Sequence, residues 1–421
     1  MEYHDPERGE ELAERVRAFV DEEVIPVERE VLGDGPVSDE QVRRLRDEAR
    51  ERDLYAPQVD EEYGGLGLSF REVLPAFEAA GRSLLAPAAL RIDAPDEGNI
   101  HTLELLGTDE QKERWLPPLV AGEITSGFSM TEPMQGAGSD PKMIRTTAEK
   151  DSAEQSSADP REAEASRDGD EWVIDGHKWW TTNGVDADLL IVMARTDEDV
   201  HPYEGCSLFL VPADTDGVEV VRDIPHTGGE VRGSNHAEIR YDGVRVPEEN
   251  LLGYEDAGFM HVQQRLGPAR LTHCMRFSGM AERALDVAKA YATEREAFGD
   301  RLADKQSLRF DVADLETRLH AARCMVRHAA DEIEAGEEAR VPVSMAKTFT
   351  ANVVQDVIDR AVQVCGGNGI GKDLPLANFY ENVRAFRIVD GADEVHKRVV
   401  ARDAFEDVDP GAIEGITRYD G

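Results

Sequence analysis

The sequence predicts an α+β protein in which two helical regions flank a middle antiparallel β-barrel or sandwich. Residues 10–123 and 258–405 place apolar side chains at helical spacing. Residues 124–242 instead hold short apolar runs separated by Gly, Asn and Asp, a pattern typical of strands. We therefore expect an N-terminal helical domain over 1–123, a β domain over 124–242 and a C-terminal four-helix-bundle domain over 243–421.

The first helical region opens with an amphipathic segment. Leu12, Val16, Phe19 and Val20 fall on one helix face. Ser38, three residues before Gln41, offers a cap for another helix. Residues 107–110 start a further one.

In the middle region, short β-rich runs occupy 171–175, 189–194, 207–211 and 218–221. Residues 151–170 are rich in Ser, Ala, Asp and Glu and have almost no large apolar side chain. We interpret this segment as a solvated hairpin insertion without a catalytic part; a regulatory or partner-binding role is the alternative.

The second helical region contains amphipathic segments at 279–289 and 306–335. A further helix over 353–365 is expected to stop at Gly366 and Gly367, because glycine is the preferred residue just beyond a helix end.

Acidic residues dominate the charge: 87 Asp and Glu against 47 Lys and Arg give a net charge of −40. Such a surface repels nucleic acid and anionic membranes. A content of 40% hydrophobic residues argues against a disordered acidic protein, so we favour a fold adapted to high salt. No apolar run predicts a membrane span, and residues 1–17 lack a signal peptide's apolar core. We expect a cytoplasmic protein without membrane insertion.

Several common site patterns are missing or incomplete. Residues 366–373 resemble a P-loop, but Asp373 stands where Ser or Thr must bind Mg²⁺, and the segment follows a helix. No GxGxxG follows a strand, no HExxH occurs, and the four cysteines form no CxxC. We expect reduced thiols and no metal site.

Four blocks of sequence stand out: 128–140, 176–184, 291–306 and 363–369 with 389–396. In residues and order these blocks closely resemble the acyl-CoA dehydrogenase family, over essentially the whole chain. The resemblance implies a flavin, a flat ring with a polar edge, which needs an aromatic face and short hydroxyls. Trp180 suits the ring face, and Thr131 and Thr182 suit its edge.

The resemblance implies the family's helix–β–helix fold, an FAD cofactor, an acyl-CoA substrate and electron transfer to an electron-transferring flavoprotein. It also implies a homodimer or homotetramer, because the arginine of the third block reaches the FAD of a neighbouring subunit. The cofactor-binding residues carried over are Phe128, Met130, Thr131, Gly138, Ser139, Trp180, Thr182, Arg295, Phe298, Leu302, Gln306, Gln363, Gly366, Gly367, Ala392 and Glu394. The substrate-binding residues are Ser139, Arg270 and Gly391.

Some of these residues have plain structural alternatives. Because strand side chains alternate between faces, one of Trp179 and Trp180 is expected to face the interior of the barrel. The resemblance assigns Trp180 to the flavin. Ser139 contacts pyrophosphate or the CoA arm, or caps a loop. Arg295 has the planar fork that suits pyrophosphate, or is an exposed helix-end arginine. Gly366 and Gly367 admit a diphosphate, or end a helix.

Asp390 is the candidate catalytic base. An apolar pocket would raise the pKa of such a carboxylate and suit it to α-proton abstraction. The family usually has glutamate here, but the spacing from Gly367 matches without a gap; aspartate is shorter by about 1.5 Å. Some members carry the base near Arg270 instead, where this chain has Ala269. Asp393 and Glu394 are rivals.

The motif 390–396, with 266–276, 94–99 and 375–378, is most similar to acyl-CoA dehydrogenase family members ten and eleven, whose base is also aspartate. The 131–140 loop is one residue longer than in that subgroup. Arg270 steers the thioester, anchors the base or forms a structural ion pair, and we expect His273 to be structural. Two other functions remain open: a nitroalkane oxidase-like flavoenzyme and a non-catalytic CoA-thioester-binding protein.

Overall fold

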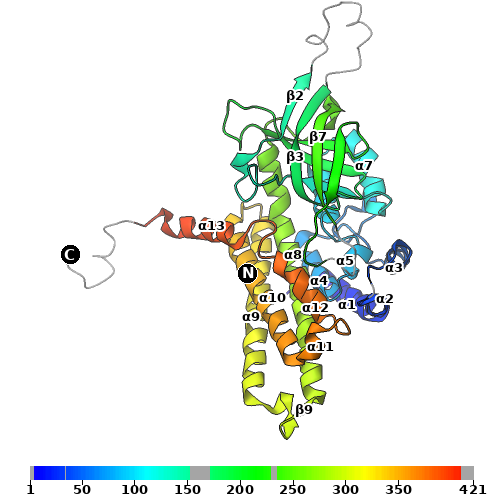
Figure 1. Ribbon diagram of the computed structural model, residues 1–421, viewed down its shortest axis with the longest axis vertical. Coiled ribbons are helices and arrows are strands. Elements are labelled where there is room, and N and C mark those ends of the chain that lie inside the picture. The colour runs from blue at the N-terminus through cyan, green and yellow to red at the C-terminus, as the bar shows by residue number, and fades with distance from the viewer. Residues whose placement is uncertain (1–3, 34, 152–170, 229–234, 409–421) are drawn as a thin grey trace, which may run out of the picture.

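A computed structural model describes residues 4–33, 35–151, 171–228 and 235–408 (Figure 1). The chain runs from helices through one sheet to a second set of helices. Apart from Asp151, the predicted hairpin insertion 151–170 lies outside the described residues. None of the helices in the described part of the chain is long and apolar enough to cross a membrane.

The elements before the sheet are α1 (Glu7–Phe19), the π-turn Val20–Val24, α2 (Ile25–Val31), α3 (Asp39–Glu51), a 3-10 turn at Glu61–Tyr63, α4 (Phe70–Gly81), α5 (Ala86–Ala89), α6 (Asp96–Leu106) and α7 (Asp109–Ala121). The two helix starts predicted from sequence are confirmed. Ser38 and Thr108 each form a capping box, with Gln41 and Gln111 respectively, which satisfies backbone N–H groups that a helix start leaves free.

The strands are β1 (Ser126–Ser129), β2 (Thr147–Asp151), β3 (Glu171–Thr182), β4 (Leu189–Arg195), β5 (Cys206–Pro212), β6 (Val218–Asp223), β7 (His236–Pro247) and β8 (Leu251–Leu252), with 3-10 turns at Pro141–Met143 and Glu248–Asn250. They pair in the order β6-β7-β3-β2-β4-β5-β8, and β1 joins β4. The sheet is not purely antiparallel as predicted, because β1 and β2 each run parallel to β4. Strands β2 and β3 lie between β1 and β4 in the chain, which provides the long connection that this parallel pair needs.

Strand β4 buries both of its faces, which fixes the sheet against the helices. Leu189, Ile191 and Met193 join the large core shared with the helices. The alternate residues Leu190 and Val192 join a separate core inside the β domain. Because strand side chains alternate between faces, one strand serves two cores.

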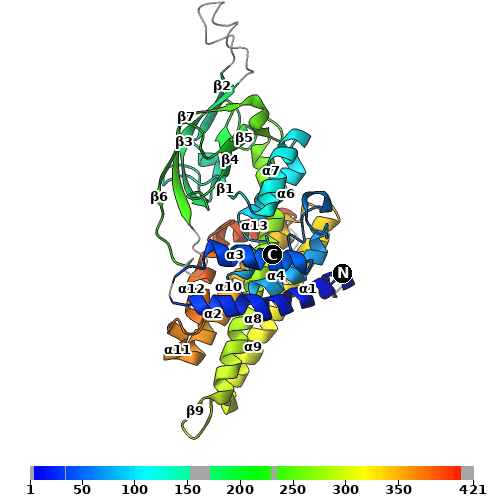
Figure 2. The same cartoon turned by 90° about the vertical axis from the view of Figure 1, so that its right-hand side faces the viewer.

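After the sheet come α8 (Gly258–Glu294), the β9–β10 hairpin (Glu296–Ala297, Asp300–Arg301), a 3-10 turn at Leu302–Asp304, α9 (Gln306–Glu334), α10 (Arg340–Cys365), α11 (Gly367–Ile370), α12 (Leu376–Ala385) and α13 (Asp393–Glu406). Figure 2 shows α1–α4 crossing one side of the long helices. Helix α4 meets α8 closely, since a Cβ on Gly279 would lie 1.9 Å from the Glu78 carbonyl oxygen. This contact holds α8, which carries site residues, against the N-terminal helices.

Candidate active site

Asp390 lies on a strained turn between α12 and α13. Its φ of 55° and that of Gly391, 103°, place two consecutive residues in the left-handed region. Aspartate adopts this conformation only at a cost, which the surrounding structure must offset.

Three cationic or potentially cationic side chains hold the turn from three helices. Arg270 on α8 donates its Nε to the Asp390 carbonyl at 2.8 Å, and His396 on α13 contacts the same oxygen at 3.3 Å. Lys347 on α10 donates to the carbonyls of Gly391 and Phe386, both at 2.7 Å. Of the three roles open to Arg270, the contact supports anchoring of the base.

The Asp390 carboxylate is 21% exposed and lies 3.4 Å from His273 Nδ1. Burial raises the pKa of this carboxyl, but the charges of Arg265, Arg270 and Lys347, and of His273 when protonated, outweigh burial. Its pKa therefore lies below the ordinary 3.8. The expectation that its surroundings raise this pKa was wrong, because the pocket is electropositive and not apolar.

A buried polar group on α6 and α8 completes the surroundings of Asp390, and sequence patterns missed it. Arg265 is 7% exposed, lies over the Phe128 ring at 4.1 Å and donates to Asn99 Oδ1 at 3.1 Å. Glu97 is 6% exposed. Burial raises the pKa of Glu97, opposed by the charges of Arg276 and Arg265. Both helices carry other charged residues, so residue type alone did not single out this group.

Trp180 stands at a bulge in β3 and does not belong to the barrel core. The β3–β7 register shifts between Lys178 and Thr181, Trp180 has a φ of 59°, and its side chain is 44% exposed. Simple strand alternation therefore fails here. Thr182 Oγ1 lies 3.1 Å from His236 Nδ1, and the His236 ring packs edge-on against Trp180 at 5.7 Å.

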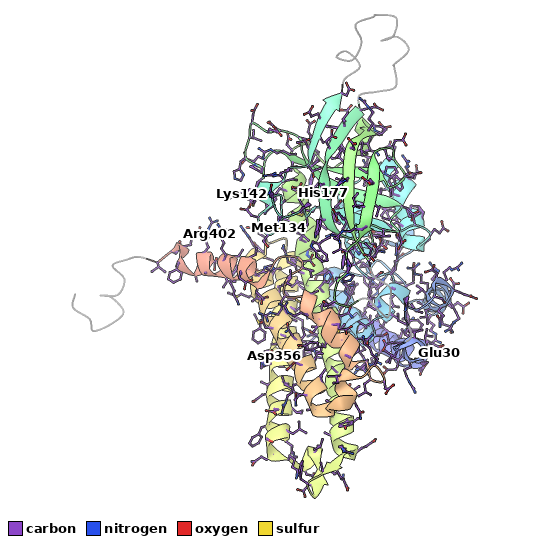
Figure 3. The ribbon with its side chains drawn as sticks, in the orientation of Figure 1. Glu30, Met134, Lys142, His177, Asp356 and Arg402 are labelled. Carbon is purple, nitrogen blue, oxygen red and sulfur yellow. The ribbon has the colours of Figure 1, made fainter. Side chains whose placement is uncertain are left out.

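Glu132 organises the loop that holds Met130, Thr131, Gly138 and Ser139. Its carboxylate accepts the backbone N–H groups of 137, 145 and 146, at 2.8–3.1 Å, and pairs with the buried Lys178 at 3.1 Å. Lys178 also donates to the Met130 carbonyl. Gly138, Ser139 and Met134 are exposed on this loop, Met134 fully so (Figure 3).

A second group of predicted cofactor residues lies at the far end of the long helices, near β9 and α11 (Figure 1). Arg295 and Gln306 are exposed, Phe298 is 99% exposed at the hairpin tip, and Leu302 is half-buried. A cavity of about 330 Å³ between the ends of α8, α9 and α10 adjoins them. At this end Gln363, Gly366 and Gly367 are exposed too.

The structure therefore separates the candidates into two groups. Arg270 and Arg295 lie 25 residues apart along α8, a rise of about 38 Å. Ala392 and Glu394 remain with the first group, at the start of α13. Of the rival bases, Asp393 is buried against Arg387 and Asn352, whereas Glu394 points into solvent.

Replacing Gly391 by alanine is expected to lower the free energy of unfolding by roughly 1–3 kcal/mol. The new Cβ would lie 2.8 Å from His396 Nε2, at a φ of 103°. Chemical denaturation of Gly391→Ala measures the loss. Gly64→Ala is the matched control, because its φ of 94° is similar but a Cβ there meets nothing within 4 Å. Equal losses in both variants would show that the packing on His396 contributes nothing.

Three protein-family models match this chain, one for each of its three parts. The acyl-CoA dehydrogenase N-terminal, middle and C-terminal domain families match residues 6–123, 127–244 and 256–405. The probable acyl-CoA dehydrogenase FadE2 of Mycobacterium tuberculosis is 42% identical over 86% of this chain and 84% of its own length. Acyl-CoA dehydrogenase family member 10 of Mus musculus is 36% identical over 93% of this chain.

This chain spans only 36% of the length of that mouse protein, and 51% of family member 11 of Gallus gallus, to which it is 33% identical over 95% of its own length. Among solved structures, butyryl-CoA dehydrogenase from Megasphaera elsdenii superposes with a TM-score of 0.82 at 27% identity, covering 96% of this chain and all of the other. An acyl-CoA dehydrogenase from Geobacillus kaustophilus gives 0.80 at 30% identity, with 97% and 100% coverage. The chain therefore belongs to the acyl-CoA dehydrogenase family of enzymes.

Proposed function

We propose that this enzyme removes two hydrogens from the α and β carbons of an acyl-CoA thioester, giving the trans-2-enoyl-CoA, with Asp390 as the base. The observation that carries the proposal is the anchored turn at 390. Arg270, His396 and Lys347 fix its carbonyls, which leaves the carboxylate 21% exposed for a ligand.

The residues of this chain supply the proton chemistry. Asp390, ionised at neutral pH because its pKa is lowered, takes the α-proton as the C–H bond breaks. The resemblance assigns the backbone N–H of Asp390 to the thioester carbonyl, where negative charge develops. Arg270 and His396 hold the Asp390 carbonyl, which belongs to the peptide that follows this N–H.

The described residues fit FAD as cofactor. Trp180 offers an exposed ring face beside the Thr182 hydroxyl. At Gly138, Gly366 and Gly367 a Cβ would meet nothing within 4 Å, so bare backbone faces open space, as a diphosphate requires. FAD held there would supply the hydride acceptor for the β-hydrogen.

A second subunit completes the site in this proposal. Arg295 lies about 38 Å along α8 from Arg270, which holds the base turn, and Phe298 lies in the hairpin just beyond α8. They are also exposed, which suits contact with the cofactor of a neighbouring copy in a homodimer or homotetramer. Family membership supports an electron-transferring flavoprotein as electron acceptor.

The purified protein is expected to be yellow and to lose its flavin absorbance when an acyl-CoA is added without oxygen. Acyl-CoAs of graded length and branching identify the preferred chain, and oxidised electron-transferring flavoprotein is expected to restore the colour. Bleaching by a nitroalkane and not by any acyl-CoA would contradict the proposed reaction. Purification without flavin from cells that supply it would contradict the cofactor.

A further inference from the structure

The guanidinium of Arg265 on α8 is enclosed by two other elements near the base. Its Cζ lies 4.1 Å from the centre of the Phe128 ring on β1. It also lies against α6, since a Cβ on Gly98 would come within 3.1 Å of its Cζ and Nη2. The side chain is 7% exposed, and its charge helps to lower the pKa of Asp390. Arg265 is therefore a buried cation between the base and a segment that is expected to contact the flavin.

Much of the hydrogen-bonding capacity of this guanidinium is unused. Arg265 donates its Nε to Asn99 Oδ1 at 3.1 Å, and the Asn99 amide in turn donates to Ser126 Oγ at 2.9 Å. Among the described residues, none accepts a hydrogen bond from either Nη atom of Arg265. Polar groups buried to this degree are normally hydrogen-bonded, so the Nη atoms indicate a ligand that the protein itself does not supply.

Glu97 on α6 is a second buried group of this kind. It is 6% exposed, and no described residue donates a hydrogen bond to its carboxylate or forms an ion pair with it. Burial raises the pKa of Glu97, and the charge of Arg265 opposes that rise. The two side chains are thus close enough for their charges to interact, but they do not pair with each other. Both can bond a third group.

The charges around this pair favour an uncharged ligand group. Arg265 only donates hydrogen bonds, and the ionised Glu97 carboxylate only accepts them. A hydroxyl group does both and adds no charge. A carboxylate would meet the negative charges of Glu97 and Asp390, and an ammonium group would meet the positive charges of Arg265 and Arg270. Burying either charge without a matched partner is costly.

We propose that Arg265 and Glu97 form a specificity site for an acyl chain that carries a hydroxyl group beyond its β carbon. The inference rests on the proposed function, in which the α and β carbons react, so the hydroxyl lies further along the chain. The hydroxyl accepts a hydrogen bond from Arg265 and donates one to Glu97. An alkyl chain would leave both buried groups without partners, and a site of this kind strongly rejects the analogue that lacks the hydroxyl.

The first test is anaerobic stopped-flow reduction of the flavin in the wild-type holoenzyme. Acyl-CoAs of equal length are compared with and without a hydroxyl, which is placed on successive carbons beyond the β carbon. We expect the second-order rate constant of the best hydroxylated substrate to exceed that of its alkyl counterpart by roughly 100-fold or more. Equal constants for every pair would overturn the inference and leave the dehydrogenase function standing. No reduction by any acyl-CoA would overturn the proposed function itself.

Glu97→Leu is expected to lower the preference for the hydroxylated chain by about 10-fold or more, because its rate falls and the rate with the alkyl chain rises. Glu97→Gln keeps an acceptor oxygen and should retain most of the preference. The matched control is Glu104→Leu, about two turns further along α6, where the carboxylate accepts the Asp60 backbone N–H instead. This control should keep the full preference. An undiminished preference in Glu97→Leu would overturn the assignment.

Arg265→Met removes the donor of the pair and is expected to lower the preference in the same way. Its effect on Asp390 cancels in the ratio of the two substrates, because both react with the same base. Flavin content is measured first, since Arg265 also lies on Phe128. Loss of flavin with an unchanged preference in the remaining holoenzyme would assign Arg265 to the cofactor and overturn its role in specificity. If either variant does not fold, the comparison of substrates in the wild-type enzyme still decides.

Discussion

Asp390→Asn is expected to keep the yellow colour of the enzyme and to slow flavin reduction by acyl-CoA about 10³–10⁴-fold. The amide has nearly the shape of the carboxylate but cannot take the α-proton. The contacts that fix the turn involve the backbone carbonyls of 390 and 391, so they survive the substitution. Anaerobic stopped-flow absorbance measures the loss.

Asp393→Asn distinguishes the base from its neighbour. The Asp393 carboxylate accepts from Arg387 Nε at 2.8 Å and from Asn352 Nδ2 at 3.0 Å, so its loss should weaken the start of α13. Flavin reduction should nevertheless continue. An Asp393→Asn enzyme that is folded and flavin-loaded but unreduced by acyl-CoA, beside a reducible Asp390→Asn, would reverse the assignment.

The lowered pKa of Asp390 has a consequence for pH. In the free enzyme the base stays ionised down to a pH below 3.8, so it sets no acid limb near neutrality. The ionised carboxylate also stabilises the fold above its unfolded pKa, and this contribution is lost as pH falls through the lower folded pKa. If activity falls with acid at a pH above 3.8, the group that titrates is therefore either Asp390 in the substrate-bound enzyme or a different residue.

Local patterns were enough to predict much of the fold and to single out Asp390 as the candidate base. Capping residues such as Ser38 and Thr108 act within one turn, and the position of Asp390 follows from spacing along the chain. The direction of the Asp390 pKa could not be obtained in this way. It is a sum over charges from α8, α10 and the base turn, which meet only in three dimensions.

The same reasoning explains what was missed at the sheet and beside the base. The position of the Trp180 side chain does not follow strand alternation, because the β3–β7 register shifts at that point. The shift depends on the partner strand, which lies far away in the sequence. Nothing in the sequence places His273 beside Asp390, 117 positions later, although their side chains lie 3.4 Å apart. In both places, contacts between segments far apart in the sequence, and not residue type, determine where the side chain lies.

Asp96→Ala is expected to lower the free energy of unfolding by about 3–5 kcal/mol, the largest stability effect we expect from a single substitution. Asp96 Oδ2 pairs with Arg91 Nη1 at 2.7 Å, and both side chains are at most 1% exposed. Its Oδ1 accepts the backbone N–H and the hydroxyl of Ser126, at 2.8 and 2.6 Å. Alanine leaves the buried guanidinium without its hydrogen-bonded counter-ion, although the charge of Asp93 remains nearby. The uncompensated burial costs more than the lost contacts.

Asp47→Ala is the matched control, because Asp47 pairs with Arg50 at a similar 2.8 Å but is 72% exposed. Water screens that pair, so the loss should stay below about 1 kcal/mol. Guanidinium denaturation compares the two variants, and equal losses would contradict the effect of burial.

The Asp96→Ala substitution should also lower activity. Asp96 bonds α6 to β1, and the next turn of α6 carries Asn99, which accepts a hydrogen bond from Arg265 beside the candidate base. A destabilised but fully active Asp96→Ala would show that the base is positioned by α8 and the C-terminal helices alone.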